Sequence, residues 1–477
     1  MTAYIAPDTE SPAPHYGASV TKVEPGGIER IPPEERHGSA VQLLWTWTSP
    51  NLEFATVYVG VLAVLIFGLS FWVAVVALVL GNALGSLTHG VLSSWGPRHG
   101  LPQMVLSRSA FGYWGNALPA GINAVMAGVG WFAVNSVSGA LALAALTGWS
   151  AKLSLLIVVA VEVVVAFFGH NLVHAFERFA FPVLLVVFVL GAVAVFGKAH
   201  LGAAADPTGV GGFAGFTLTF SAAFGYAAGW NPYATDYTRY LPAGIGRARV
   251  GLMAGLGDFL SCTALMIIGA AAVTVGDKTT KNPTADFTGV MPHWIGNLVL
   301  LGIALGAVAA NALNIYSGAM SFLAMGVKLP LALRRAIVAL GFGAVGLALA
   351  WHGLKDAGES YEAFLLVIAY WIAPWLGVVL TDRLLRLRSL AGIGSIDSVD
   401  EVVIDRGYVN LTGPIAMLLG MVLSIWLFSD QTKYTGPMVT AHGSIGDLTL
   451  LVGFAVSALV YLLLVKILKP RTLSSAG

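Results

Sequence analysis

The sequence predicts an all-α membrane protein: twelve transmembrane helices, with a five-plus-five inverted repeat of the leucine-transporter-like kind. Three observations predict this class. Hydrophobic residues make up 57% of the chain and charged residues only 10%, whereas a soluble protein carries about 25% charged residues. Apolar stretches of about 20 residues, the length that spans a bilayer as a helix, recur along the chain. Two of these stretches, the first and the sixth, are broken by a proline.

Twelve apolar stretches are expected to cross the membrane. They lie at about 39–68, 71–94, 115–146, 152–170, 179–197, 213–241, 248–276, 293–323, 330–350, 361–382, 410–429 and 447–467. The polar residues 1–38 show no cleavable signal peptide, and we expect them to form a mostly disordered cytoplasmic tail. The polar segment 389–409 is expected to be a solvated connector.

The positive charges predict the orientation. One set of loops is rich in arginine, whereas the opposite loops hold only scattered lysines. The arginines of the first set are Arg98, Arg108, Arg178, Arg239, Arg247, Arg249, Arg334, Arg335, Arg383, Arg386 and Arg388. Because Lys and Arg concentrate in cytoplasmic loops, we expect this side and both termini to be cytoplasmic, with the chain in the plasma membrane.

The first and sixth spans are interrupted where a proline stands beside an asparagine, at Pro50-Asn51 and at Asn231-Pro232. Free backbone groups are costly in hydrocarbon, so such breaks persist where they line a cavity or a site. Two broken helices in corresponding places are typical of inverted-repeat transporters, whose binding site lies at the breaks. The alternative is a pair of ordinary proline kinks.

This interpretation divides the chain into four parts. Residues 1–38 form the cytoplasmic tail, and residues 39–382 form a transport core of ten helices. Residues 383–409 form a cytoplasmic connector, and residues 410–477 form two extra helices with a short cytoplasmic tail.

Large aromatic and carboxamide side chains lie near the breaks. Trp131 and Asn135 are four residues apart in the third span, and Asn311 and Asn314 are three apart in the eighth, so each pair shares a helix face. Together with Trp230 at the sixth-span break, they suit a planar heterocycle, since indoles stack on its faces and amides pair with its edge. The alternatives are tryptophans of an interface belt and asparagines that only hydrogen-bond a neighbouring helix.

Ionisable residues at membrane depth are functional candidates because a buried charge is costly there. Glu53 follows the first break and Asp258 lies in the seventh span. We expect these two to couple transport to an ion, and we interpret Glu162 in the fourth span as a neutralised structural group. Asp236 and Arg239 lie three residues apart near the cytoplasmic end of the sixth span. They are candidates for a gate pair, the alternative being a solvated helix end.

Other classes of function are disfavoured. The single cysteine, Cys262, excludes an internal disulfide and a cysteine-cluster metal site. An enzyme would need a catalytic set at membrane depth, and His170 and His174 stand at a predicted cytoplasmic helix end without such partners. A channel would need a continuous polar stripe. We therefore expect no enzymatic activity, no cofactor, no metal site and no nucleic-acid partner, with lipid around the chain.

Several motifs between residues 26 and 382 carry a family resemblance. They are Gly27-Ile28-Glu29-Arg30-Ile31-Pro32-Pro33-Glu34-Glu35-Arg36, Gly96-Pro97-Arg98-His99-Gly100-Leu101-Pro102-Gln103, Gly130-Trp131 with Asn135, Gly229-Trp230-Asn231-Pro232, Asp236-Tyr237-Thr238-Arg239-Tyr240-Leu241-Pro242 and Asn314-Ile315-Tyr316-Ser317. With these motifs the chain resembles the nucleobase–cation symporter family, specifically its purine–cytosine permease branch. The resemblance implies uptake of a neutral nucleobase, such as cytosine or a purine, by cation symport. The alternative substrate is a related heterocycle: hydantoin, allantoin, uracil or thiamine.

The resemblance also assigns roles to particular residues. It implies that Trp131 and Trp230 stack on the substrate and that Asn135 and Asn314 bind its edge. It implies that a polar residue of the first break, either Ser49 or Asn51, contributes as well.

One departure from the family bears on the coupling ion. Sodium-coupled relatives carry hydroxyls on the eighth helix about one turn before the substrate asparagine. Residues 305–310 of this chain are Leu-Gly-Ala-Val-Ala-Ala and hold no hydroxyl. A sodium ion wants about five or six oxygen ligands, and this site would lack some of them. We therefore predict a co-transported proton in preference to sodium.

Overall fold

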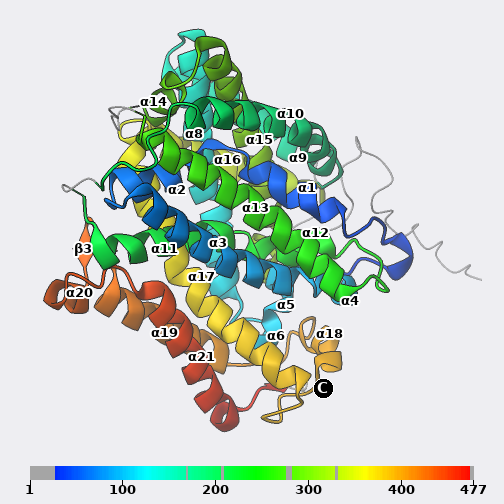
Figure 1. Cartoon of the computed structure of the whole chain (residues 1–477). Coiled ribbons are helices and arrows are strands. Elements are labelled where there is room, and N and C mark those ends of the chain that lie inside the picture. Colours follow the sequence, from blue (N-terminus) through cyan, green and yellow to red (C-terminus); the bar gives the residue numbers. More distant parts are fainter. Residues whose placement is uncertain (1–26, 168–169, 206–208, 276–281, 328–330, 473–477) are drawn as a thin grey trace, which may run out of the picture.

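The computed structural model describes residues 27–167, 170–205, 209–275, 282–327 and 331–472, and these residues are mostly helical (Figure 1). The elements up to the second break are η1 (Pro33–Glu35), α1 (Gln42–Thr48), η2 (Ser49–Asn51), α2 (Phe54–Leu65), α3 (Phe71–Ser93), α4 (Gly96–His99), α5 (Gln103–Leu106), α6 (Arg108–Phe111), α7 (Ala117–Val125), η3 (Met126–Trp131), α8 (Phe132–Thr147), α9 (Ala151–Phe167), α10 (His170–Phe196), α11 (Gly212–Ala228), η4 (Asn231–Tyr233) and α12 (Ala234–Thr238). The elements after it are α13 (Arg247–Val273), α14 (Pro283–Gly289), α15 (His293–Ala324), α16 (Leu331–Gly353), α17 (Ala357–Leu387), η5 (Ile396–Ser398), α18 (Val399–Val402), β1 (Tyr408–Val409), α19 (Thr412–Phe428), β2 (Asp430–Gln431), β3 (Tyr434–Thr435), α20 (Pro437–Ala441), α21 (Thr449–Leu468) and β4 (Arg471–Thr472).

Each of the twelve predicted spans coincides with one long helix or with a group of consecutive shorter helices. Among the described residues, six helices are long and apolar enough to cross a membrane, and the bent pair α1–α2 makes a seventh. Others are shorter apolar helices, such as Thr412–Phe428. The structure is therefore consistent with twelve spans, although length and composition select only these seven.

The first span bends by 60° at its break, between α1 and α2. Pro50 cannot donate a backbone hydrogen bond, so the helix ends there in the single turn η2. Glu53 starts α2 by accepting hydrogen bonds from the backbone N–H of Ala55 at 2.7 Å and of Thr56 at 3.1 Å. Its side chain is thus the N-cap of the second half of the span.

The sixth span breaks in the same way. α11 ends at Ala228, and the turn η4 with Pro232 leads into α12. A third irregularity lies in the third span, where Met126–Trp131 forms a π-helical turn. Such turns are frequent at functional sites. Gly130 in this turn packs against the ring of Phe364, since an added Cβ would lie 2.4 Å from that ring.

Helix pairs recur as an inverted repeat requires. The first helix of one half packs on the second helix of the other half in both directions, since α2 packs on α13 and α11 packs on α3. In the same way α9 packs on α15, and α16 packs on α8. The second helices of the two halves, α3 and α13, pack on each other, and so do the third helices, α8 and α15. The fold is the five-plus-five inverted repeat that the sequence predicts.

The last two spans lie at the periphery, where α19 and α21 pack beside α17 (Figure 1). Asp382 of α17 accepts hydrogen bonds from Tyr461 of α21 at 2.8 Å and from Ser109 of α6 at 2.8 Å, and it pairs with Arg386 at 2.9 Å. Two short antiparallel ribbons, β1–β4 and β2–β3, complete this region.

The N-terminal segment and the connector are more ordered than expected. Residues 27–37 were expected to belong to a disordered tail, yet Ile31 N–H donates to Gly100 O at 3.0 Å and Arg36 donates to Pro97 O at 2.7 Å. In the connector, Asp400 contacts His99 at 2.7 Å and Arg30 at 2.9 Å. Three segments distant in sequence therefore meet at the loop around α4.

Asp400 has an altered acidity in this contact. Burial raises its pKa, but the hydrogen bonds from His99 and Arg30 and their charges lower it by more, so the pKa lies below its ordinary value. Its ionised form thus joins the connector to the N-terminal segment.

Candidate substrate and ion site

The two breaks meet through Asn51. The Asn51 carboxamide oxygen accepts a hydrogen bond from Trp230 Nε1 at 2.8 Å. Its Nδ2 lies 3.2 Å from Asp258 Oδ1 and 2.8 Å from Trp47 O. Asn51 therefore links the tryptophan of the second break to a carboxyl group on α13.

Asp258 is completely buried and has three side-chain donors. Ser86 of α3 donates to Oδ2 at 2.7 Å, and Asn51 and Cys262 lie 3.2 Å and 3.3 Å from Oδ1. Cys262 is a buried core residue. Hydrogen bonds of this kind make a carboxyl group tolerable in a low-dielectric interior.

The second part of the site is a cluster of amides. Asn311 Oδ1 accepts hydrogen bonds from Asn135 Nδ2 at 3.1 Å and from Asn314 Nδ2 at 3.3 Å. Asn311 Nδ2 donates to Phe132 O at 2.9 Å and lies 3.2 Å from Ser136 Oγ. The predicted asparagines of the third and eighth spans therefore meet, and Asn311 orients the other two.

Asn135 Oδ1 and Ser49 Oγ are among the buried oxygens that have no hydrogen-bond partner among the described residues. Buried polar atoms are almost always paired, and an unpaired one calls for an explanation. Both atoms belong to residues that the sequence assigns to the substrate site.

The predicted tryptophans are both buried, with Trp131 8% and Trp230 6% exposed. Trp131 meets the ring edges of Tyr226 and Phe364 at 5.2 Å and 5.1 Å between centroids. A Cβ added to Gly229 would lie 3.3 Å from the Trp131 ring, so this ring borders the second break. Burial of this extent differs from that of an interface belt.

Tyr233 connects Trp230 to the amide cluster. Its ring lies 5.5 Å from that of Trp230, and its hydroxyl donates to Asn314 Oδ1 at 3.2 Å. A cavity of about 340 Å³ between α8, α16 and α17 is lined by Gly130 and Phe364, but none of the predicted site residues lines it. The aromatic and amide groups thus lie together around the second break.

The other two carboxylates have different surroundings. Glu53 caps α2 and also accepts a hydrogen bond from Tyr226 at 2.6 Å. Glu162 is completely buried behind the amide cluster, where its Oε2 lies 2.6 Å from Ser136 Oγ. Its Oε1 has no partner among the described residues. Glu53 is thus tied to the helix restart, and Glu162 stands one hydroxyl group away from Asn311.

The stretch of the eighth span that lacks hydroxyls, residues 305–310, is closely packed against the first break. A Cβ added to Gly306 of α15 would lie 2.4 Å from Leu52 O and 2.9 Å from the Glu53 side chain. The eighth span thus lies directly against the first break. Its residues 305–310, around this contact, carry no hydroxyl.

Asp236 and Arg239 bond to different segments. Asp236 Oδ1 accepts a hydrogen bond from the backbone N–H of Gln103 at 2.9 Å. Arg239 is completely buried and donates to Gly27 O at 2.9 Å and to the Tyr316 hydroxyl at 3.2 Å. Both residues hold α12 against the segments on which it packs.

The sequence analysis did not single out some residues of this site. Tyr233 stands one residue after the Trp-Asn-Pro motif and Ser136 follows Asn135, so proximity to a motif could have found them. Tyr226 and Ser86 lie on ordinary apolar helices, and no local signal distinguishes them. Their partners are more than 170 residues away in the chain.

A buried polar site between two broken helices of an inverted repeat defines a membrane transporter. A family model for permeases for cytosine/purines, uracil, thiamine and allantoin matches residues 30–453. The chain belongs to this family of permeases, which are transporters and not enzymes.

Relatives match over nearly the whole chain. A purine–cytosine permease of Emericella nidulans is 30% identical, over 94% of this chain and 89% of the relative. One of Saccharomyces cerevisiae is 27% identical, over 95% and 87%. In fold, the chain is similar to a transporter of the nucleobase-cation-symport-1 family in a closed conformation with bromovinylhydantoin bound (TM-score 0.70, 18% identity, 93% of this chain and 94% of the other). It is also similar to a Na⁺-coupled sialic acid symporter (TM-score 0.62, 12% identity, 93% and 92%).

Proposed function

We propose that this permease is a secondary active symporter that takes up a neutral nucleobase, cytosine or a purine. The observation that carries the proposal is the amide cluster, in which Asn135 Oδ1 has no partner among the described residues, together with the two buried tryptophans of the third and sixth spans. An N–H on the edge of a base would satisfy that oxygen, and an indole would cover the ring. The relatives named as purine–cytosine permeases support the same substrate class.

The geometry supports a division of roles among the predicted site residues. Trp131 and Trp230 stack on the base, Asn135 and Asn314 bind its edge, and Asn311 orients both amides. At the first break, Ser49 has a free hydroxyl oxygen, whereas the Asn51 carboxamide is fully engaged by Trp230, Trp47 and Asp258. Ser49 therefore contacts the base directly. Asn51 links the bound base to Asp258 through its hydrogen bonds.

The coupling ion is a proton, and the geometry favours Asp258 over Glu53 as its carrier. Asp258 is one side chain away from Trp230, through Asn51. Glu53 is engaged as the helix cap of α2. The close contact of Gly306 with Leu52 O and the absence of hydroxyls at 305–310 argue against a sodium site there.

We propose that the chain lies in the plasma membrane with both termini in the cytoplasm, and the arginine-rich loops support this orientation. Asp236 and Arg239 then belong to a gate on the cytoplasmic side. Arg239 holds the N-terminal segment at Gly27 and the eighth span at Tyr316.

Uptake by purified protein in proteoliposomes tests the substrate. Radiolabelled cytosine and adenine are offered under an inward proton gradient, with unlabelled uracil, allantoin, hydantoin and thiamine as competitors. We expect uptake of cytosine or adenine, with weak competition by the other four compounds. Uptake that thiamine or allantoin blocks best, with no transport of either base, would contradict the proposal.

A further inference from the structure

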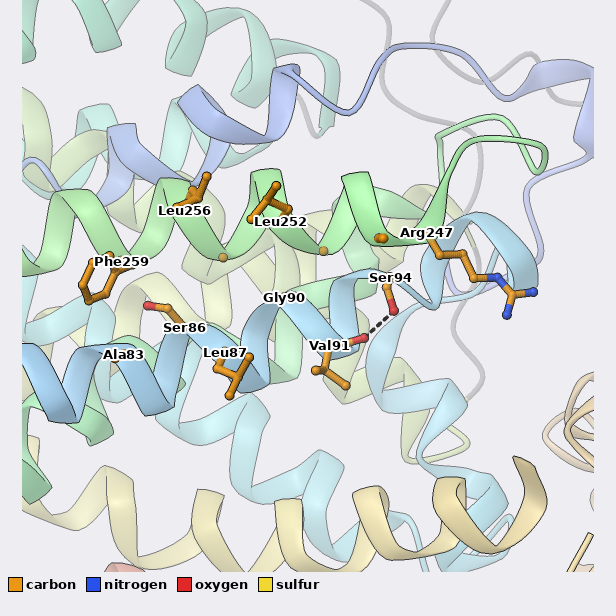
Figure 2. Close-up of a pocket in the computed structure, with 13 residues that line it drawn as sticks. Ala83, Ser86, Leu87, Gly90, Val91, Ser94, Arg247, Leu252, Leu256 and Phe259 are labelled. Carbon is orange, nitrogen blue, oxygen red and sulfur yellow. Dashed lines mark hydrogen bonds between the residues drawn. The ribbon is translucent and has the colours of Figure 1, made fainter. Parts of the chain in front are cut away.

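An apolar groove of about 510 Å³ lies between α3 and α13, on the surface of the molecule (Figure 2). We call it the α3–α13 groove. Its apolar lining includes Leu87 and Val91 of α3 and Leu252, Leu256 and Phe259 of α13. None of the residues assigned above to the base lines it, so it is separate from the substrate site.

The groove opens to the outside of the molecule. Where the two helices cross, a Cβ added to Gly90 would lie 2.5 Å from Gly251 O, so the backbones are in contact there. The neighbouring side chains project outward from this crossing, with Leu87 64% and Leu252 56% exposed. In a membrane-spanning helix pair, an outward apolar surface of this kind is covered by acyl chains.

The length of the groove equals about one leaflet. Its lining on α13 runs from Arg247 to Phe259, which is twelve steps along the helix, or about 18 Å at 1.5 Å per residue. Half of the hydrocarbon core measures about 15 Å. The groove thus has room for an acyl chain that runs from the membrane surface to the middle of the bilayer.

One end of the groove is positively charged. Arg247 is exposed there beside Ser94, whereas Ala83 and Phe259 lie at the other end (Figure 2). α13 begins at Arg247, and its N-cap, Gly246, offers no side chain to the first backbone N–H groups. A guanidinium next to free N–H groups at a helix N-terminus matches the charge and geometry of a phosphate.

We propose that the α3–α13 groove binds one anionic phospholipid. The acyl chain lies along Leu87, Leu252 and Phe259, and the head-group phosphate contacts Arg247 and the N-terminus of α13. The inference rests on the proposed orientation, which places Arg247 at the cytoplasmic leaflet, where anionic lipids attract basic residues. It does not depend on which base is carried. Ser86 of the groove donates to Asp258, so the lipid packs against the helices that hold the coupling carboxyl.

Lipid retention by the purified transporter tests the site. The protein is reconstituted in nanodiscs of phosphatidylcholine with one-fifth phosphatidylglycerol, extracted in mild detergent, and examined by native mass spectrometry. Arg247→Gln removes the head-group contact and Ala248→Phe fills the groove. Arg249→Gln is the matched control, because it removes the next exposed arginine of the same helix, which does not line the groove.

We expect one phosphatidylglycerol on the wild type and on Arg249→Gln. Retention should fall by about five-fold in Arg247→Gln, the effect of one surface arginine, and Ala248→Phe should retain neither lipid. Equal retention of both lipids by the wild type, or unchanged retention in both groove variants, would overturn the site. A dimer that Ala248→Phe abolishes would show that a second copy of the chain covers the groove. Melting temperatures of the variants report their folding, and base uptake is measured separately, so failure of the lipid site leaves the substrate proposal untouched.

Discussion

The unpaired oxygen of Asn135 is the most specific residue-scale feature of the site. It is held in place because Asn135 Nδ2 is committed to Asn311, so the oxygen faces away from that bond. An amide that is fixed in this way offers an acceptor to one donor group of the base and discriminates between bases by their edges.

The first prediction concerns this amide. Asn135→Ala should raise the apparent KM for the base by roughly 5- to 150-fold, because the lost contact leaves a polar group of the base unpaired at a cost of about 1–3 kcal/mol. Asn135→Asp, which keeps an oxygen, should alter which bases compete. Asn297→Ala, on the same helix as Asn314 but outside the site, is the control. Uptake kinetics with competition measure both effects, and an unchanged KM and competition profile in both Asn135 variants would remove this residue from the site.

The second prediction concerns the two tryptophans. Trp131→Ala and Trp230→Ala should each weaken binding by roughly 5- to 150-fold, since a base–aromatic stack contributes about 1–3 kcal/mol. The phenylalanine variants should retain part of the binding. Trp294 is 59% exposed and serves as the control position. Binding of the base by isothermal calorimetry reports the change, and unaltered affinity in both alanine variants would assign the tryptophans to packing alone.

At the scale of elements, the connector, the N-terminal segment and the α4 loop form one contact. Asp400 is its centre, because it joins His99 and Arg30. The ends of three elements therefore depend on the charge of one carboxylate.

The third prediction follows from the lowered pKa of Asp400. A carboxyl group whose pKa is lower in the folded state stabilises the fold above its unfolded pKa of about 3.9, and this stabilisation is lost as the pH falls through the folded value. Asp400→Asn should therefore lower the melting temperature near neutral pH. The difference from wild type should shrink below about pH 4. Thermal unfolding in detergent across this range measures it, with Asp405→Asn as the control, and a pH-independent difference would show that charge is not the cause.

At the scale of the whole molecule, transport requires the substrate site and the ion site to act together. Asn51 makes this connection, since it lies at the break of the first half and contacts both Trp230 and Asp258 of the second half. Occupancy by the base and the charge of Asp258 can therefore influence each other directly.

The fourth prediction tests this connection. Asp258→Asn should abolish accumulation driven by a proton gradient yet keep exchange of labelled for unlabelled base, because an amide imitates only the protonated carboxyl group. Wild-type uptake should need no sodium at fixed pH. Glu53→Gln, which weakens the cap of α2, should reduce folding yield more than coupling. Accumulation and exchange in proteoliposomes separate these outcomes, and strict sodium dependence or full accumulation by Asp258→Asn would contradict the proposed coupling.

Much of this architecture could be predicted from the sequence, because the relevant signals are local. A span is determined by the hydropathy of about 20 consecutive residues, and a break by a proline that removes a backbone donor. Both signals survive any change in packing, so helices coincide with the predicted spans, and the first and sixth spans break at the predicted prolines. Motifs are local signals too, and they led to four predicted site residues: Trp131, Asn135, Trp230 and Asn314.

Only the tertiary structure decided which groups meet. Asn51 and Asp258 are 207 residues apart, and their hydrogen bond depends on how α13 packs against the first break. The packing of other helices placed Tyr233 between Trp230 and Asn314 and brought Gly90 of α3 against Gly251 of α13 at the groove. Contacts of this kind are set by the crossing of helices, and no local pattern along the chain encodes them.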